Sequence, residues 1–136
     1  MLSHSFYPAI GGIESISEML SEEFLAGGHE VRLLTRTTAD QPDHFSFPVI
    51  RNPDFITIVN SIIWSDVVFE NNLCLGMSWP NIFLRKPLIT GIQTWIADNK
   101  GKRSLLHAFK KIWISTSAAL VACARSYLQR PKSRTP

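Results

Sequence analysis

The chain has 136 residues, enough for one folded domain with its own core but too few for two full domains. With 45% hydrophobic and 18% charged residues, the composition excludes an intrinsically disordered protein, and a net charge of +3 is too small to indicate a nucleic-acid partner. The first residues lack the basic and then apolar regions of a signal peptide. The most apolar late segment, Ile112 to Cys123, is far shorter than the roughly 20 residues that span a bilayer. We therefore expect a cytoplasmic protein, soluble or peripheral on the inner membrane surface.

Neither the cysteines nor the histidines have the spacing of a metal or catalytic site. Cys74 and Cys123 each lie in an apolar run, which predicts two reduced, buried thiols. The histidines are scattered singly and form no ligand pair and no Ser-His-Asp arrangement. His4, at the end of the first expected strand, is placed to reach a cleft. We predict no metal and no cofactor.

The first third of the chain predicts a strand, a helix and a second strand. Residues 1–6 form a short strand, shorter than the apolar run that opens most doubly wound folds, as if residues upstream of Met1 were missing. Pro8 and the pair Gly11-Gly12 predict a turn. From Ile13 apolar residues recur at steps of three and four, which predicts a helix that Gly27-Gly28 ends. Residues 30–35 read as the second strand.

The rest of the chain alternates strands with helices. We expect strands at 47–51, 66–69, 86–92 and 118–123, the last of them buried, and helices at 55–64, 73–84 and 104–115, with a break near Trp79-Pro80. This alternation predicts an α/β fold, a Rossmann-like, doubly wound, mostly parallel sheet covered on both faces. A single domain spans residues 1–127, and the basic tail 128–136 is predicted to be disordered.

In such a sheet ligands bind beyond the carboxyl ends of the strands, which nominates the first loop, Asn71 and the stretch Gln93-Thr94-Trp95. Gly11-Gly12 before a helix exposes backbone N–H groups at the positive end of the helix dipole, where an anion such as a diphosphate binds well. The plainer alternative is a tight turn without a ligand. A nicotinamide or Walker-type site is not indicated, because the chain has neither G-x-G-x-x-G nor a glycine-lysine-serine/threonine triplet.

Basic and apolar residues alternate between Lys100 and Trp113. On a helix the apolar residues form one stripe, which could contact anionic lipid as a peripheral membrane segment. The alternative is a helix that covers the sheet and exposes its lysines. We favour this second interpretation, because the sheet needs the apolar stripe.

Two motifs separated by one helix carry a family resemblance. The first is Phe6-Tyr7-Pro8-x-x-Gly11-Gly12-Ile13-Glu14, and the second is Gly28-His29-Glu30-Val31 at the start of the next strand. Together they resemble the amino-terminal domain of family-four glycosyltransferases. These are retaining enzymes of the GT-B fold that transfer a sugar from a nucleotide-sugar donor to an acceptor. The resemblance continues more weakly to about Tyr127.

The resemblance implies that Gly11 and Gly12 lie against the donor diphosphate and that the domain mainly binds the acceptor, a glycan or a lipid-linked molecule. We expect Glu14 to cap the helix and orient this loop. We expect the acceptor cleft to be lined by His4, Asn71, Gln93 and Trp95. Two stretches depart from the family pattern: Gln93-Thr94-Trp95 stands where many relatives have a histidine, and Ala124-Arg125-Ser126 where they often have a serine directly after the strand.

The family's carboxyl-terminal domain, which holds the nucleotide and the E-x7-E motif, has no counterpart in this sequence. The first hypothesis is therefore a truncated, acceptor-binding half of a glycosyltransferase that transfers no sugar by itself. The second is a non-catalytic α/β binding or interaction module derived from such a domain. A neighbouring reading frame with paired glutamates would favour the first hypothesis.

Overall fold

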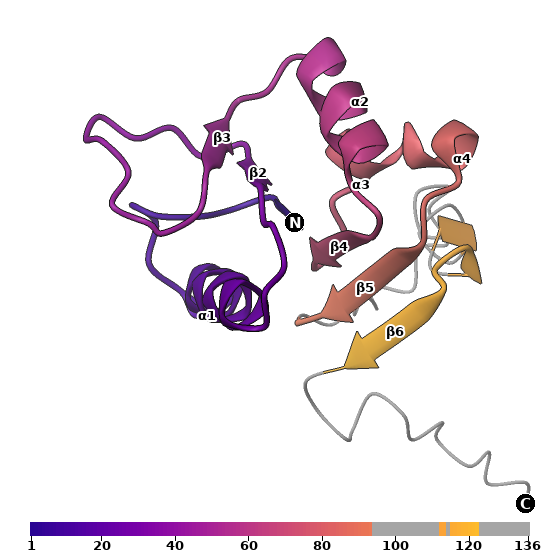
Figure 1. Ribbon diagram of the computed structural model, residues 1–136, viewed down its shortest axis with the longest axis horizontal. Helices are drawn as coiled ribbons and strands as arrows, with labels where there is room; N and C mark the ends of the chain where they lie inside the picture. Colours follow the sequence, from indigo (N-terminus) through magenta and orange to yellow (C-terminus); the bar gives the residue numbers. More distant parts are fainter. Residues whose placement is uncertain (94–111, 114, 123–136) are drawn as a thin grey trace, which may run out of the picture.

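The computed structural model describes residues 1–93, 112–113 and 115–122 (Figure 1). Within these residues six strands form one sheet in which every neighbouring pair is parallel. The order β3-β2-β1-β4-β5-β6 is typical of a Rossmann-like fold. The strands are β1 (Leu2–Ser3), β2 (Leu33–Thr35), β3 (Val49–Arg51), β4 (Val68–Asn71), β5 (Leu88–Ile92) and β6 (Ala119–Ala122).

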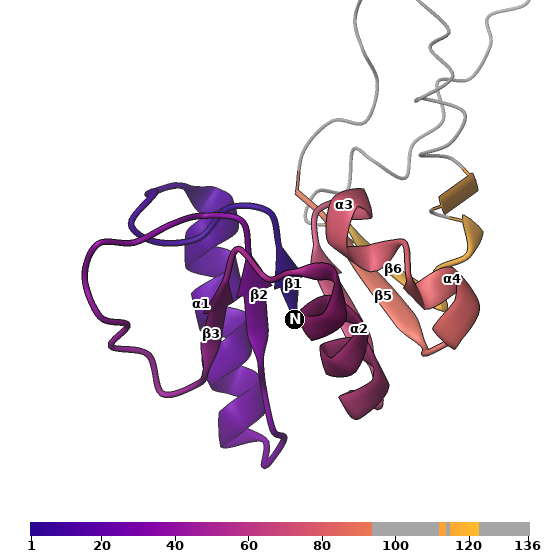
Figure 2. The same ribbon diagram turned by 90° about the horizontal axis from the view of Figure 1, so that it is seen from above.

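Helices cover both faces of the sheet (Figures 1 and 2). One face carries α1 (Gly12–Ala26), and the other carries α2 (Phe55–Trp64), α3 (Leu75–Ser78) and α4 (Asn81–Leu84). Each face has its own apolar cluster, because side chains alternate along a strand. Leu34 packs in the cluster beneath α2 and α3, whereas Leu33 packs in the cluster beside α1. The parallel sheet with helices confirms the predicted α/β, Rossmann-like fold.

Helix α1 has the predicted place but not the predicted buried face. Gly27 and Gly28 end it as expected: their N–H groups donate back to the last turn at 2.9 Å, and Gly28 has a φ of +84° that favours glycine. Its buried residues are Glu14, Ser17 and Ser21, while the isoleucines and leucines predicted to face the core are only half-buried. Small hydroxyl side chains let α1 lie close to β1 and β4, so polar contacts hold the centre of this interface.

The other described helices follow the sequence closely. Helix α2 has the predicted bounds, and the Asp54 carboxylate caps it by accepting a hydrogen bond from the Thr57 N–H at 2.8 Å. The predicted break at Trp79-Pro80 separates α3 from α4, and Pro80 directly precedes α4.

Five of the six strands are shorter than predicted, β4 has the predicted length but begins two residues later, and the last strand is not buried. Strand β1 contains Leu2 and Ser3 alone rather than residues 1–6. Strand β6 forms the edge of the sheet, and its Leu120 and Val121 are 47% and 50% exposed. The prediction of a buried sixth strand is therefore wrong, because burial depends on the order of the strands as well as on their hydrophobicity. Most of the predicted helix 104–115, the boundary at 127 and the tail 128–136 lie outside the described residues.

Candidate functional site

The loop that joins β1 to α1 crosses the carboxyl edge of the sheet and is held by aromatic packing. Phe6 is completely buried, and its ring lies 4.8 Å from Phe45 and 6.3 Å from Phe47, centroid to centroid. Tyr7 packs edge-on against Phe6 at 5.4 Å. Beyond these rings the loop turns outward, and Ile10 is 88% exposed. The beginning of the loop is therefore fixed to the core, and its tip faces solvent.

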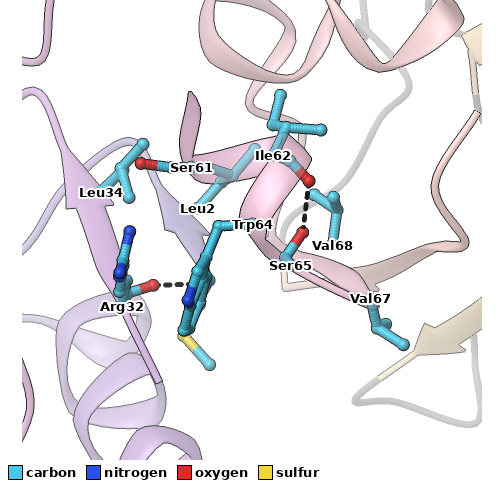
Figure 3. Close-up of a pocket in the computed structure, with 10 residues that line it drawn as sticks. Leu2, Arg32, Leu34, Ser61, Ile62, Trp64, Ser65, Val67 and Val68 are labelled. Carbon is cyan, nitrogen blue, oxygen red and sulfur yellow. Dashed lines mark hydrogen bonds between the residues drawn. The ribbon is translucent and has the colours of Figure 1, made fainter. Parts of the chain in front are cut away.

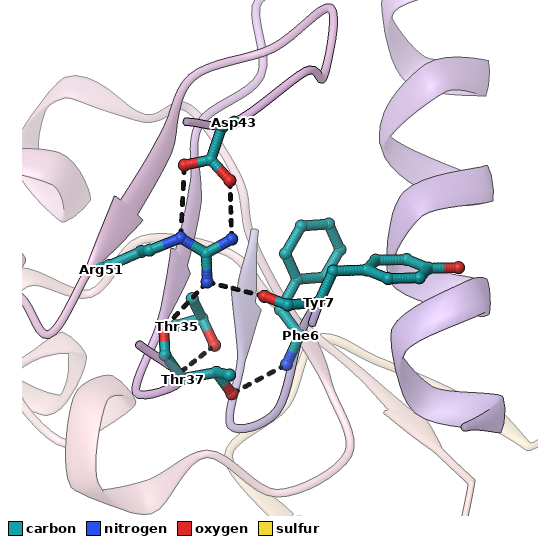
Figure 4. A network of polar contacts seen from close by, with 6 residues as sticks. All are labelled: Phe6, Tyr7, Thr35, Thr37, Asp43 and Arg51. Carbon is teal, nitrogen blue, oxygen red and sulfur yellow. Dashed lines mark hydrogen bonds and ion pairs between the residues drawn. The ribbon is translucent and has the colours of Figure 1, made fainter. Parts of the chain in front are cut away.

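Arg51, at the end of β3, joins this loop to the segment after β2 (Figure 4). One guanidinium nitrogen, Nη1, donates to the carbonyl oxygens of Tyr7 at 2.7 Å and of Thr37 at 2.9 Å. Nε and Nη2 donate to the two carboxylate oxygens of Asp43 at 3.2 and 2.6 Å. The N–H of Phe6 donates to Thr37 Oγ1 at 3.0 Å. No local sequence pattern points to Arg51, because its partners lie between 8 and 44 residues away along the chain.

The glycine pair of the first loop lies at the start of α1, with Gly11 as the residue that precedes the helix and Gly12 as its first residue. Glu14 folds back across the start of the helix. Its Oε1 accepts a hydrogen bond from Ser5 Oγ, and its Oε2 lies only 2.7 Å from where a β-carbon on Gly11 would be. A carboxylate at this position suits the positive end of the helix dipole. A β-carbon on Gly12, in contrast, would meet no atom within 4 Å, so the open side of the loop is at Gly12.

Asn71, predicted to line the acceptor cleft, lies inside the fold. It is completely buried at the end of β4, and its Nδ2 donates to the carbonyl oxygen of Ile13 at 2.9 Å and to Ser17 Oγ at 2.7 Å. Ser17 donates to Ser3 Oγ at 2.9 Å, and Ser3 donates to the carbonyl oxygen of Ser5 at 2.7 Å. Asn71 Oδ1 has no hydrogen-bond partner among the described residues. This chain of hydrogen bonds connects β4, α1 and β1, so Asn71 positions the first loop from beneath.

His4, directly after β1, lines a pocket of about 320 Å³ on the side of α3. The other lining residues are Arg36, Leu73, Cys74, Leu75, Gly76 and Met77. Gln93 follows β5, is half-buried and is not among them, and Trp95 lies outside the described residues. Of the predicted cleft residues that the structure describes, His4 is therefore the one that lines this pocket, and Arg36 is the other basic residue of its described lining. No sequence motif marks Arg36 as a functional residue.

A buried acid, Glu70, lies beneath this pocket and holds three elements together. Its Oε1 accepts hydrogen bonds from Thr90 Oγ1 at 2.7 Å and Trp113 Nε1 at 3.0 Å, and its Oε2 accepts one from the Cys74 N–H at 3.2 Å. In the sequence, the signal for this buried acid is its position directly after the apolar run 67–69. Trp113, at the end of the segment 100–113, is 3% exposed and packs in the core, while Ile112 beside it is 62% exposed.

Cys74 is a buried free thiol, as the sequence predicts, and Cys123 lies outside the described residues. Burial, reinforced by the negative charge of Glu70, raises the pKa of Cys74 from 9.0 to about 12. The thiol is therefore protonated at neutral pH and does not act as a nucleophile.

A second cavity, near the amino ends of the strands, is too small for a ligand (Figure 3). Its volume of about 20 Å³ has room for little more than one water molecule. Its wall includes Arg32, whose guanidinium carbon lies 3.9 Å from the centroid of the Trp64 ring. This contact lies at the amino ends of the strands, opposite the first loop.

Comparison with protein families, with curated proteins and with solved structures finds no match to this chain. Among the described residues, no helix is long and apolar enough to cross a membrane. Nor do the described histidine, cysteine and acidic side chains gather in a group of three that could hold a metal ion. The proposed function therefore rests on the geometry of the site and on the sequence motifs alone.

Proposed function

We propose that the chain is the acceptor-side half of a family-four-like, GT-B glycosyltransferase. The observation that supports this most is the position of the Phe6-to-Glu14 motif. It joins the central strand β1 to α1 at the carboxyl edge of a parallel sheet with the order 3-2-1-4-5-6. This edge is where doubly wound folds bind nucleotides and their sugars. The second motif, 28–31, leads into β2 beside it.

In this proposal Gly12 is the point of contact with the donor diphosphate. The absence of a side chain there lets phosphate oxygens approach the first N–H groups of α1, a helix of 15 residues. Arg51 and Asn71 contact no ligand. They hold the two ends of the loop, through Tyr7 and through Ile13, so that the loop keeps its shape before the donor arrives. The chain contributes binding and positioning, and transfer needs the nucleotide-binding domain that these 136 residues do not include.

One observation favours the second candidate, a non-catalytic binding module. The Glu14 carboxylate already lies beside Gly11, at the end of the helix where a diphosphate would be attracted. Two negative groups at one helix terminus repel each other, which weakens donor binding unless Glu14 turns away.

Saturation-transfer NMR with a panel of nucleotide-sugars separates the two candidates. The glycosyltransferase proposal expects a signal from at least one nucleotide-sugar that is lost in Gly12→Leu and retained in Glu23→Gln. Glu23 is an exposed residue at the other end of α1 and serves as the control. No signal from any member of the panel would favour the binding module. Sugar transfer by these 136 residues alone would contradict the proposal that transfer needs a second, nucleotide-binding domain.

A further inference from the structure

His4 and Arg36 are brought together by the register of two parallel strands. Leu2 pairs with Leu34 and Ser3 pairs with Thr35 in the β1–β2 ladder. His4 and Arg36 are the next residues on each strand, so they come side by side at the carboxyl edge. Because side chains alternate, both lie on the face of Leu2 and Leu34, the face that α2 and α3 cover. Both line the 320 Å³ pocket.

The other described residues of the pocket wall are uncharged. They are apolar or small: Leu73, Cys74, Leu75, Gly76 and Met77. Glu70 lies beneath the wall, where its carboxylate accepts a hydrogen bond from the N–H of the lining residue Cys74 and others from Thr90 and Trp113. The Cys74 thiol carries no charge at neutral pH. Among the described residues, the lining of this pocket therefore includes two basic side chains and no carboxylate.

Arg36 is an exposed residue whose guanidinium group makes one hydrogen bond and keeps further donors to offer. Its Nη1 donates to the carbonyl oxygen of Pro53 at 3.0 Å, which anchors the end of the side chain. Its other N–H groups have no partner among the described residues. A planar, anchored guanidinium binds the paired oxygens of a phosphate or carboxylate well, and an imidazole beside it adds another donor.

We propose that this pocket binds the oxyanion group, a phosphate or a carboxylate, of a small molecule. A volume of about 320 Å³ is at the lower end of the range for ligand pockets and accommodates a sugar phosphate. The site is separate from Gly11 and Gly12, which open α1 on the other face of the sheet. That the bound molecule is the sugar acceptor rests on the proposed function, whereas the oxyanion site itself does not.

Two variants test the pocket in different ways. Arg36→Gln removes the anchored charge, and Gly76→Val fills the space, since a β-carbon on Gly76 would meet no atom within 4 Å. The matched control is Arg32→Gln. It also removes one guanidinium charge, but from the residue just before β2, at the opposite end of the strand from Arg36. Circular dichroism and thermal unfolding establish that each variant is folded. His4→Gln, at an exposed residue, removes the imidazole group that lines the pocket beside Arg36.

The full chain is titrated by isothermal calorimetry with inorganic phosphate, glucose 6-phosphate, acetate and glucose. We expect phosphate or acetate to bind and glucose not to bind. The anion that binds more tightly identifies whether the pocket recognises a phosphate or a carboxylate group. We expect a loss of about tenfold or more in both Arg36→Gln and Gly76→Val, as for removal of a charged hydrogen-bond donor, and little change in Arg32→Gln. No anion binding, or equal losses in Arg36→Gln and Arg32→Gln, would overturn the proposal. Anion binding together with no nucleotide-sugar signal in the saturation-transfer experiment would support the oxyanion pocket and contradict the glycosyltransferase proposal.

Discussion

Glu14 and Gly11 share one small space at the start of α1: a β-carbon on Gly11 would lie 2.7 Å from Glu14 Oε2. Gly11 has extended backbone angles that any residue adopts, so contact with the carboxylate, and not the backbone, requires glycine here. Glu14 is 7% exposed and is held by Ser5, so it has little room to move. The neighbouring Gly12 has open space around it.

This difference predicts that Gly11→Ala and Gly12→Ala have opposite effects on the free energy of unfolding. Gly11→Ala should destabilise the fold by about 1 kcal/mol, because Glu14 must leave its hydrogen bond with Ser5. Gly12→Ala should be neutral or stabilising by up to about 1 kcal/mol, since alanine is the better helix former. Urea unfolding followed by far-UV circular dichroism measures both. Equal effects would mean that the carboxylate is not fixed beside Gly11.

Arg51 provides a second prediction, on the first loop. Arg51→Lys should destabilise the fold by about 1–3 kcal/mol, because the three N–H groups on one ammonium nitrogen cannot reach the four acceptor oxygens that the guanidinium fork spans. Asp43→Asn should cost less than about 1 kcal/mol, since the Asp43 side chain is 28% exposed and solvent screens the ion pair. Urea unfolding gives the free energies. A larger effect of Asp43→Asn would show that the ion pair, rather than the two carbonyl contacts, holds the loop.

How far the sequence predicts this molecule depends on whether a feature is local. Helix α2 has the bounds that the sequence predicts, because its apolar run and the strand that follows it are neighbours along the chain. The exposure of β6 was not predicted, since it depends on which strands lie beside it. In the site, the loop at Gly11-Gly12 was visible in the sequence. The pairing of His4 with Arg36 was not, because it follows from the register of β1 and β2.

Asn71 gives a third prediction, which distinguishes a positioning residue from one that contacts a ligand. Asn71→Asp should destabilise the fold by about 1–3 kcal/mol at neutral pH, because a carboxylate would face the carbonyl oxygen of Ile13 in place of a donor. Gln93→Glu is the control, at a half-buried residue also predicted to line the cleft, and should change stability by less than about 0.5 kcal/mol. Thermal unfolding at pH 7 measures both variants. A stable Asn71→Asp protein would argue that Asn71 is open to solvent and available to a ligand.

Cys74 gives the last prediction, on how stability depends on pH. Burial raises its pKa from 9.0 to about 12, so between these values the folded protein keeps a proton that the unfolded chain loses. The contribution to stability is therefore fully present below about pH 9 and is lost as the pH rises toward about 12. In a Cys123→Ser background, Cys74→Ala should unfold with a weaker pH dependence above pH 9 than the protein that retains Cys74, whatever the cost of the lost packing. A thiol-specific reagent at pH 8 should label Cys74 only after unfolding in urea. Rapid labelling of the folded protein, or identical pH profiles, would contradict the burial of this thiol beneath the pocket.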